Sequence, residues 1–142
     1  AAAFFALRAL SRTSGAHRED IPGAPAPGDE RIALFRLEGS LFFGAAERLV
    51  DEVAAAGDVE VVILRLSQLQ IIDATGANAL SEMVTALEQR GVTVLLKGIR
   101  PEHRELLAQL GVIESLRHPN HLFTELEPAV AHARSHIARG SR

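Results

Sequence analysis

The chain has 142 residues, of which 47% are hydrophobic and 23% are charged. A composition so close to that of an average globular domain excludes a disordered or fibrous chain, and the length suffices for one hydrophobic core. Because cysteine is absent from the sequence, the chain has no disulfide framework, no thiolate metal site and no cysteine nucleophile. The formal net charge of −3 offers no basic field for nucleic acid, so we expect no nucleic-acid partner.

The first ten residues are apolar apart from Arg8, and Arg12 and Arg18 follow them. Ten helical residues rise only about 15 Å, which is half of what a membrane span requires. An apolar run followed by arginines is typical of the cytoplasmic exit of a membrane helix, although a short amphipathic helix docked on the domain would show the same pattern. We expect residues 1–12 to be a juxtamembrane segment that follows the last membrane helix of a longer protein.

Residues 13–30 contain three prolines and three glycines, and Ile21 is their only large apolar residue. This composition is typical of a flexible linker. The sequence therefore predicts a flexible linker over residues 13–30, a folded domain over residues 31–138 and a short tail over residues 139–142.

Three runs rich in leucine, valine and isoleucine follow the linker. They show no clean alternation of apolar and polar residues, which indicates strands that are buried on both faces of a helix-covered sheet. Residues 41–43 are a candidate for one more short strand beside the first. We place the three main strands at residues 32–37, at 59–66 with an extension at 71–72, and at 92–96.

Four segments have apolar residues at helical spacing. Asp73 is a suitable N-cap for the longest of these helices and Gly91 a suitable stop, while Pro101 suits the first position of the third helix. In the fourth helix, Pro128 is tolerated only in the first turn. The predicted helices span residues 45–56, 74–90, 101–110 and 123–137.

Strands and helices alternate along the chain, and a weak strand precedes the last helix. Alternation of this kind implies right-handed crossovers and a mostly parallel sheet. The sequence therefore predicts a single α/β domain with a mostly parallel or mixed sheet of four to five strands and about four helices.

Signatures of catalysis are missing from the sequence. It has no GxxxxGK[ST] phosphate loop, no GxGxxG turn, no GxSxG elbow and no HExxH helix. His118 and His121 form one histidine pair and His132 and His136 another, but no cysteine, aspartate or third preorganised ligand accompanies them. We therefore expect no enzyme activity, no catalytic residue and no bound metal.

One segment combines a strand end with a helix start. The apolar residues up to Ile72 are followed by Asp73, Ala74, Thr75 and Gly76, and then by the longest predicted helix. Parallel α/β sheets place ligand sites at the carboxyl ends of strands, and the partial positive charge of a helix N-terminus favours an anion such as phosphate by about 0.3–1 kcal/mol. The alternative is structural: Asp73 caps the helix, Thr75 is an ordinary hydroxyl and Gly76 permits close packing.

Four stretches carry a family resemblance: EGSLFFGAAE at residues 38–47, VVILRL at 61–66, IDATGA at 72–77 and GVTVLL at 91–96. Together they resemble the STAS domain, which sulfate transporters share with anti-sigma-factor antagonists. The resemblance covers residues 31–138 and implies the STAS fold. The first stretch looks like the SulP branch of transporters specifically.

The antagonist branch usually reads Asp-Ser-Ser/Thr-Gly in the loop after the second of these stretches, and the residue directly after the aspartate is phosphorylated to break binding to an anti-sigma kinase. The corresponding residue here is Ala74, which has no hydroxyl, so only Thr75 remains as a phosphorylation candidate. This departure favours a transporter domain over the alternative, a free-standing signalling switch that binds a kinase partner.

The resemblance implies a regulatory and interaction domain of a SulP-type sulfate or anion transporter, on the cytoplasmic face of the plasma (inner) membrane. Its implied partners are the transmembrane part of its own transporter and a second protomer, in a homodimer of the full-length protein. No cofactor is required, but guanine nucleotide, as GTP or GDP, is an implied ligand. The choice of the transported anion would lie in the membrane part.

The resemblance also implies site residues. The interaction surface would include Ser40 and Phe42; the alternative for Phe42 is a place in the core. The residues that would bind phosphate or a partner are Asp73, Ala74, Thr75, Gly76 and Asn78.

Overall fold

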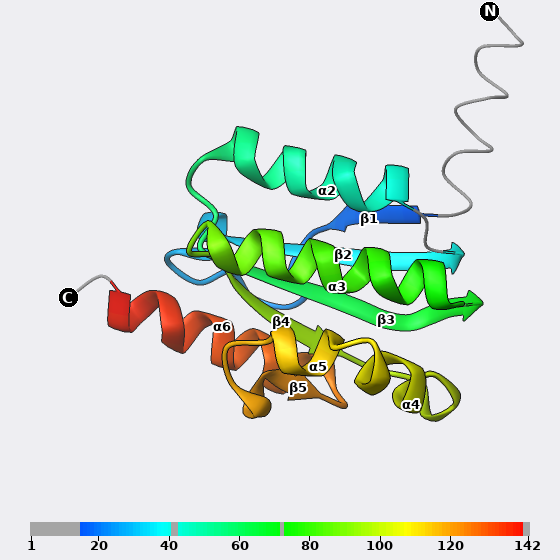
Figure 1. The fold of residues 1–142 in the computed structure, drawn as a ribbon. Coiled ribbons are helices and arrows are strands. Elements are labelled where there is room, and N and C mark those ends of the chain that lie inside the picture. Colours follow the sequence, from blue (N-terminus) through cyan, green and yellow to red (C-terminus); the bar gives the residue numbers. More distant parts are fainter. Residues whose placement is uncertain (1–14, 41–42, 72, 141–142) are drawn as a thin grey trace, which may run out of the picture.

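The computed structural model describes residues 15–40, 43–71 and 73–140. Its centre is a five-stranded sheet with the strand order β1-β2-β3-β4-β5 (Figure 1). β1 is antiparallel to β2, and the other neighbouring strands are parallel. The strands are β1 (Gly15–Glu19), β2 (Ile32–Ser40), β3 (Val61–Ile71), β4 (Thr93–Lys97) and β5 (Leu122–Phe123). The predicted juxtamembrane segment, residues 1–12, lies outside the described residues.

Helices cover the two faces of the sheet unequally. The helices α2 to α5 pack on one face, and α6 packs alone on the other (Figure 1). This arrangement confirms the predicted single α/β domain with a mixed sheet. Within the described residues, no helix has the length and apolar character needed to cross a membrane. The helices are α2 (Phe43–Ala56), α3 (Ala74–Gln89), α4 (Pro101–Gln109), α5 (Val112–Ser115) and α6 (Leu126–Gly140), with short 3-10 helices η1 (Asp29–Arg31) and η2 (Pro119–His121).

The central strand β3 is buried on both faces, because successive side chains of a strand point to opposite sides. Val62 and Leu64 belong to the larger core under α2 and α3, and Val61 and Ile63 belong to the smaller core under α6. All four side chains are fully buried, and each contributes about 1.5–3 kcal/mol by leaving water. Burial on both faces explains why the sequence of this strand shows no polar alternation.

The helix boundaries follow local signals in the sequence. α4 begins with Pro101, as predicted. α6 begins at Leu126 and not at residue 123, because Phe123 pairs with Lys97 in the strand β5. This start places Pro128 in the first turn of α6, where its missing N–H leaves no intrahelical hydrogen bond unmade.

The short strand predicted at residues 41–43 is wrong for Phe43, which begins α2. The reason is that the residues after it repeat at helical spacing: Ala45, Ala46 and Leu49 are all buried against the sheet. Leu41 and Phe42 lie outside the described residues.

The flexible linker predicted over residues 13–30 is wrong for Gly15–Glu19, which form the edge strand β1. β1 pairs with β2 along its whole length, and backbone pairing of this kind needs no apolar side chains. The carboxylate of Glu19 also lies 2.9 Å from Arg36 Nη1 and 2.8 Å from Arg65 Nη1. These two ion pairs attach the polar strand β1 to both β2 and β3.

The loop after β1 is attached to α6. Arg134 donates hydrogen bonds through Nε and Nη2 to the two carboxylate oxygens of Asp29, at 3.0 and 2.9 Å. The hydrogen bond from Arg134 lowers the pKa of the Asp29 carboxyl below its ordinary value. Next to it, Gly28 has a φ of +91°, and a Cβ built there would lie 2.7 Å from Cγ2 of Ile137. Gly28 and Asp29, which the sequence places in the linker, therefore form a turn that packs closely against α6.

The variant Gly28→Ala should lower the free energy of unfolding by about 2 kcal/mol, because it combines an unfavourable positive φ with a clash against Ile137. Urea denaturation followed by circular dichroism measures this loss. The matched control is Gly23→Ala, since Gly23 also has a positive φ of +87° but no atom within 4 Å of the added Cβ. The control should lose about 1 kcal/mol, and equal losses in the two variants would contradict the role of the clash.

Candidate functional site

The loop between β3 and α3 lies at the carboxyl edge of the parallel strands. β3 ends at Ile71 and α3 begins at Ala74, so this loop lies beside the end of β2 (Figure 1). The structure confirms the strand end and the helix start that the sequence predicts here. We call residues 73–78 the β3–α3 corner.

Asp73 is the N-cap of α3. Its Oδ1 accepts a hydrogen bond from the Gly76 N–H at 2.8 Å, and its carbonyl accepts one from the Ala77 N–H at 2.9 Å. The carboxylate thus already accepts the hydrogen bond of the Gly76 N–H, which a bound anion would otherwise accept at this helix end. Its negative charge also repels phosphate. The structural role that the sequence offered as an alternative is confirmed for Asp73.

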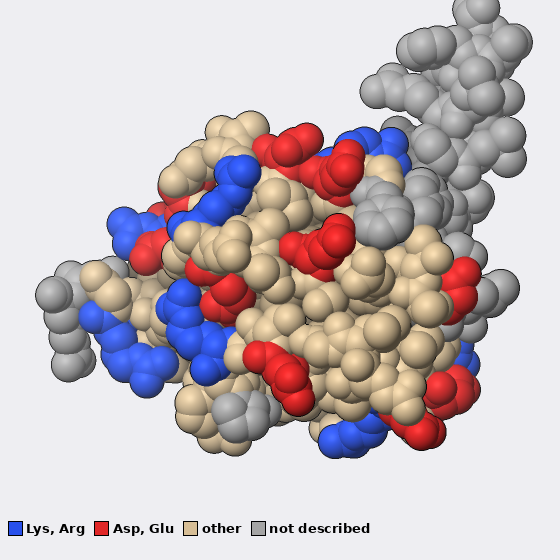
Figure 2. Space-filling view, viewed as in Figure 1, with Lys and Arg blue, Asp and Glu red and all other residues tan. Residues whose placement is uncertain are grey.

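The β3–α3 corner presents a mixed surface. Ala74, Thr75 and Asn78 are exposed together with Asp73, whereas Gly76 is buried. Figure 2 shows mostly uncharged side chains on the right half of this face of the molecule, with acidic side chains around them. A partner protein can therefore reach a methyl group, a hydroxyl, an amide and a carboxylate on one exposed surface.

The sequence predicts an interaction surface that includes Ser40 and Phe42. Ser40 is the last residue of β2, and its backbone pairs in register with Ile71 of β3. The structure thus brings the backbone of Ser40 beside the β3–α3 corner. Phe42 lies outside the described residues, so its position stays a prediction.

The sequence analysis missed two basic residues that end or follow β4. Arg100 donates a hydrogen bond from Nη1 to the carbonyl of Leu69 in β3 at 3.4 Å, and its Nε lies 3.3 Å from Oε1 of Glu102. Lys97 ends β4, and its Nζ donates to Oγ of Ser67 at 3.4 Å. A signal was present, because residues that follow any parallel strand come to the same edge of the sheet. The carboxyl edge therefore carries positive charge as well as the Asp73 carboxylate.

The histidine pairs of the sequence meet in the structure. The ring centroids of His118 and His121 lie 5.8 Å apart, and those of His121 and His132 lie 5.1 Å apart. In the described part of the chain, no group of three or more histidine, aspartate or glutamate side chains is arranged to hold a metal ion. The arrangement brings imidazole rings of the two pairs close together.

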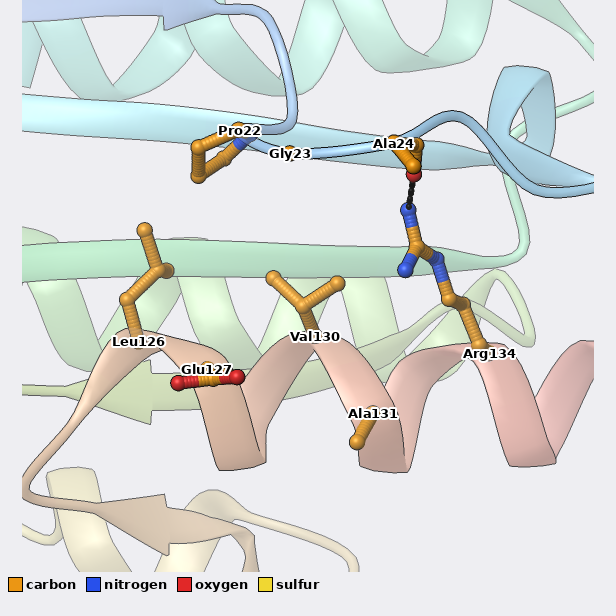
Figure 3. A pocket seen from close by; sticks show the side chains of 8 residues that line it. All are labelled: Pro22, Gly23, Ala24, Leu126, Glu127, Val130, Ala131 and Arg134. Carbon is orange, nitrogen blue, oxygen red and sulfur yellow. Dashed lines mark hydrogen bonds between the residues drawn. The ribbon is translucent and has the colours of Figure 1, made fainter.

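A groove of about 560 Å³ lies between α6 and the loop at residues 22–24 (Figure 3). Leu126 and Val130 of α6 point toward Pro22 on the opposite side. Arg134 closes one end, where its Nη2 donates to the carbonyl of Ala24 at 3.1 Å. That guanidinium also binds Asp29. Arg134 is therefore engaged in holding the loop against α6.

The mixed five-stranded sheet with helices on both faces is that of an α/β domain, and its exposed corner follows the central strand. The family model described as the STAS domain matches residues 24–129. This chain therefore belongs to the STAS domain family. The match includes β2 to β5 and the β3–α3 corner.

Two solved structures with similar sequences come from transporter proteins. The STAS domain of a SulP transporter from Vibrio cholerae is 27% identical, with a TM-score of 0.71 over 81% of this chain and 88% of that one. A sulfate transporter family protein from Wolinella succinogenes is 30% identical, with a TM-score of 0.67 over 82% of this chain and 93% of that one.

Two further relatives complete the comparison. The Bacillus subtilis (strain 168) protein YbaR, which carries a provisional sulfate transporter name, is 26% identical over 82 residues. That match covers 58% of this chain but only 17% of the length of YbaR. The unphosphorylated anti-sigma factor antagonist SpoIIAA is 18% identical with a TM-score of 0.61 over 85% of this chain and 97% of its own, which shows likeness of fold alone.

The variant Asp73→Ala should lower the free energy of unfolding by about 1 kcal/mol, because the Gly76 N–H loses its cap. Asp73→Asn should keep most of the stability, since an amide oxygen also caps helices. Asp58→Ala, which changes an exposed loop aspartate, is the control for removing a negative charge. Urea denaturation measures all three, and an Asp73→Ala variant as stable as the control would show that the cap contributes nothing.

Proposed function

We propose that this chain is the regulatory and interaction domain of a SulP-type sulfate or anion transporter, placed on the cytoplasmic face of the inner membrane. The observation that carries the proposal is the 30% identity to a sulfate transporter family protein over 93% of that protein's chain. The 27% identity to a SulP transporter STAS domain supports it independently. In this proposal the domain catalyses nothing and acts through contacts.

The proposed partners are the transmembrane part of the same transporter and a second protomer of the full-length protein. The β3–α3 corner is the proposed contact surface, because Ala74, Thr75 and Asn78 are exposed at the capped start of α3. Ser40 and Phe42 would extend this surface along the end of β2. Docking on such a surface would modulate transport by favouring one arrangement of the membrane part.

A signalling switch of the antagonist type is the competing function. The similarity to SpoIIAA concerns the fold alone, and the position directly after Asp73 is Ala74, which cannot carry phosphate. An antagonist-type switch would have to use Thr75, whose exposed position permits phosphorylation. The gene sequence upstream of Ala1 separates the two functions, because only a transporter domain would follow a series of long apolar segments.

In the full-length protein reconstituted in vesicles, Ala74→Arg should alter sulfate uptake, because a long charged side chain in the contact would weaken docking by about tenfold or more. The matched control is Ala54→Arg, on the exposed face of α2, which should leave uptake unchanged. Both variants should unfold at the same temperature as the unaltered protein. Normal uptake by Ala74→Arg, or a gene without membrane segments, would overturn the proposal.

Guanine nucleotide, as GTP or GDP, is a secondary proposal for the same corner. The helix start favours phosphate and Arg100 lies near the end of β3, but the Asp73 carboxylate opposes it. GTP titration followed by amide chemical shifts should perturb residues 73–78 more than other residues. Asp73→Asn should bind more tightly, because it removes the repelling charge and keeps the cap. Shifts no larger at the corner than elsewhere would exclude the site.

A further inference from the structure

Four histidines gather where α6 passes β5 and η2. His121 and His132 have ring centroids 5.1 Å apart, and His118 and His121 have theirs 5.8 Å apart. His136, one turn further along α6, has its Nε2 3.4 Å from Oγ1 of Thr93. We call His118, His121, His132 and His136 the histidine cluster. It lies outside the β3–α3 corner, and the proposed function makes no use of it.

His121 is the buried member of the cluster. Only 8% of this residue is exposed, and its Nδ1 has no hydrogen-bond partner among the described residues. Burial, followed by the charges of His132, His118, His136 and Arg117, lowers the pKa of His121 from 6.5 to about 4. Burial is also the main cause that lowers the pKa of His132. The folded state therefore favours neutral rings at both positions.

The charged groups around the cluster would repel an added proton. α6 contributes Arg139, and the segment before η2 contributes Arg117. Arg117 is itself paired with a carboxylate, that of Glu88 in α3. Oε2 of Glu88 lies 3.2 Å from Nε of Arg117, and its Oε1 accepts a hydrogen bond from the Val94 N–H at 3.1 Å.

The second half of α6 is held by a contact that tolerates mild acid. Arg134 binds both carboxylate oxygens of Asp29, and this contact lowers the pKa of Asp29 below its ordinary value of 3.8. The ion pair therefore persists at pH 5. Glu127, the acidic residue in the first turn of α6, lines the groove that Arg134 closes (Figure 3).

We propose that the histidine cluster is a proton-operated latch: protonation of His121 and His132 releases the first half of α6 from β5 and η2, while Arg134 and Asp29 hold the second half. Two imidazolium rings with centroids 5.1 Å apart repel each other. Their buried surroundings also favour the neutral rings over the charged ones. α6 contributes Ala129, Val130, Ala133 and Ile137 to the smaller core. Release of its first half withdraws Ala129 and Val130 from this core, which they share with the apolar sheet side chains Leu34, Ile63 and Leu95.

The direction of the effect follows from linkage. Above pH 6.5 the rings are neutral in both states, and the latch is closed. As the pH falls from 6.5 toward 4, the open state binds a proton on His121 that the closed state does not bind, so opening becomes more favourable. From pH 7.5 to 5.0, His121 alone should raise the opening constant by about thirtyfold.

Hydrogen exchange of the 142-residue chain tests the latch. Protection factors, corrected for the intrinsic exchange rate at each pH and measured with a chelator present, should fall by about thirtyfold for the first half of α6 between pH 7.5 and 5.0. The amides of α3 and β3 should change much less. An equal fall in α6 and β3 would mean general acid unfolding, and an unchanged α6 would mean no latch; either result overturns the proposal.

Two variants separate the cluster from other histidines. His121→Leu combined with His132→Leu should abolish the pH dependence of α6 protection, because no ring remains to take up the proton. The matched control is His103→Gln: His103 of α4 is also 8% exposed but lies outside the cluster, so the pH dependence should persist. Persistence in the double variant would overturn the proposal.

If the double variant fails to fold, imidazole titration of the unaltered chain by NMR decides the question. His121 should titrate well below 6.5, and the amide shifts of the first half of α6 should follow the same curve. A His121 that titrates at or above 6.5, or α6 shifts that follow no histidine, would overturn the proposal.

Discussion

The burial of β3 on both of its faces is the constraint from which the other elements take their places. A strand with apolar side chains on both sides must be covered twice, so α3 and α6 lie on opposite faces of the sheet. α3 also starts directly after the end of β3. The position of the β3–α3 corner therefore follows from the place where the central strand ends.

Sequence reasoning predicted the elements whose signals are local and strong. The double burial of β3, the N-cap Asp73 and the first-position Pro101 each reflect the physics of a few neighbouring residues. β1 was missed because its backbone pairs with β2, and its Glu19 pairs with arginines 17 and 46 residues further along the chain. No local pattern reveals such a contact. The roles of Ala74, Thr75 and Asn78 depend on a partner, and therefore neither sequence nor fold can decide them alone.

The β3–α3 corner combines two properties that usually belong to different kinds of site. A helix start at the carboxyl edge of a parallel sheet is a common place for a phosphate, but here the N-cap is an ionised side chain. The corner is thereby stable without any ligand, because the Gly76 amide already has its hydrogen bond. A preformed surface of this kind suits protein docking, which loses less free energy when the surface needs no ordering.

The contact between Glu19 and two arginines would also transmit mechanical force from β1 to the sheet. Any tension on the chain before Gly15 enters the domain through β1 and passes through backbone pairs and one carboxylate to β2 and β3. A pulling force on this end of the chain would thus act on the sheet. The smaller core, which α6 forms with β2 and β3, would be strained as the strands move.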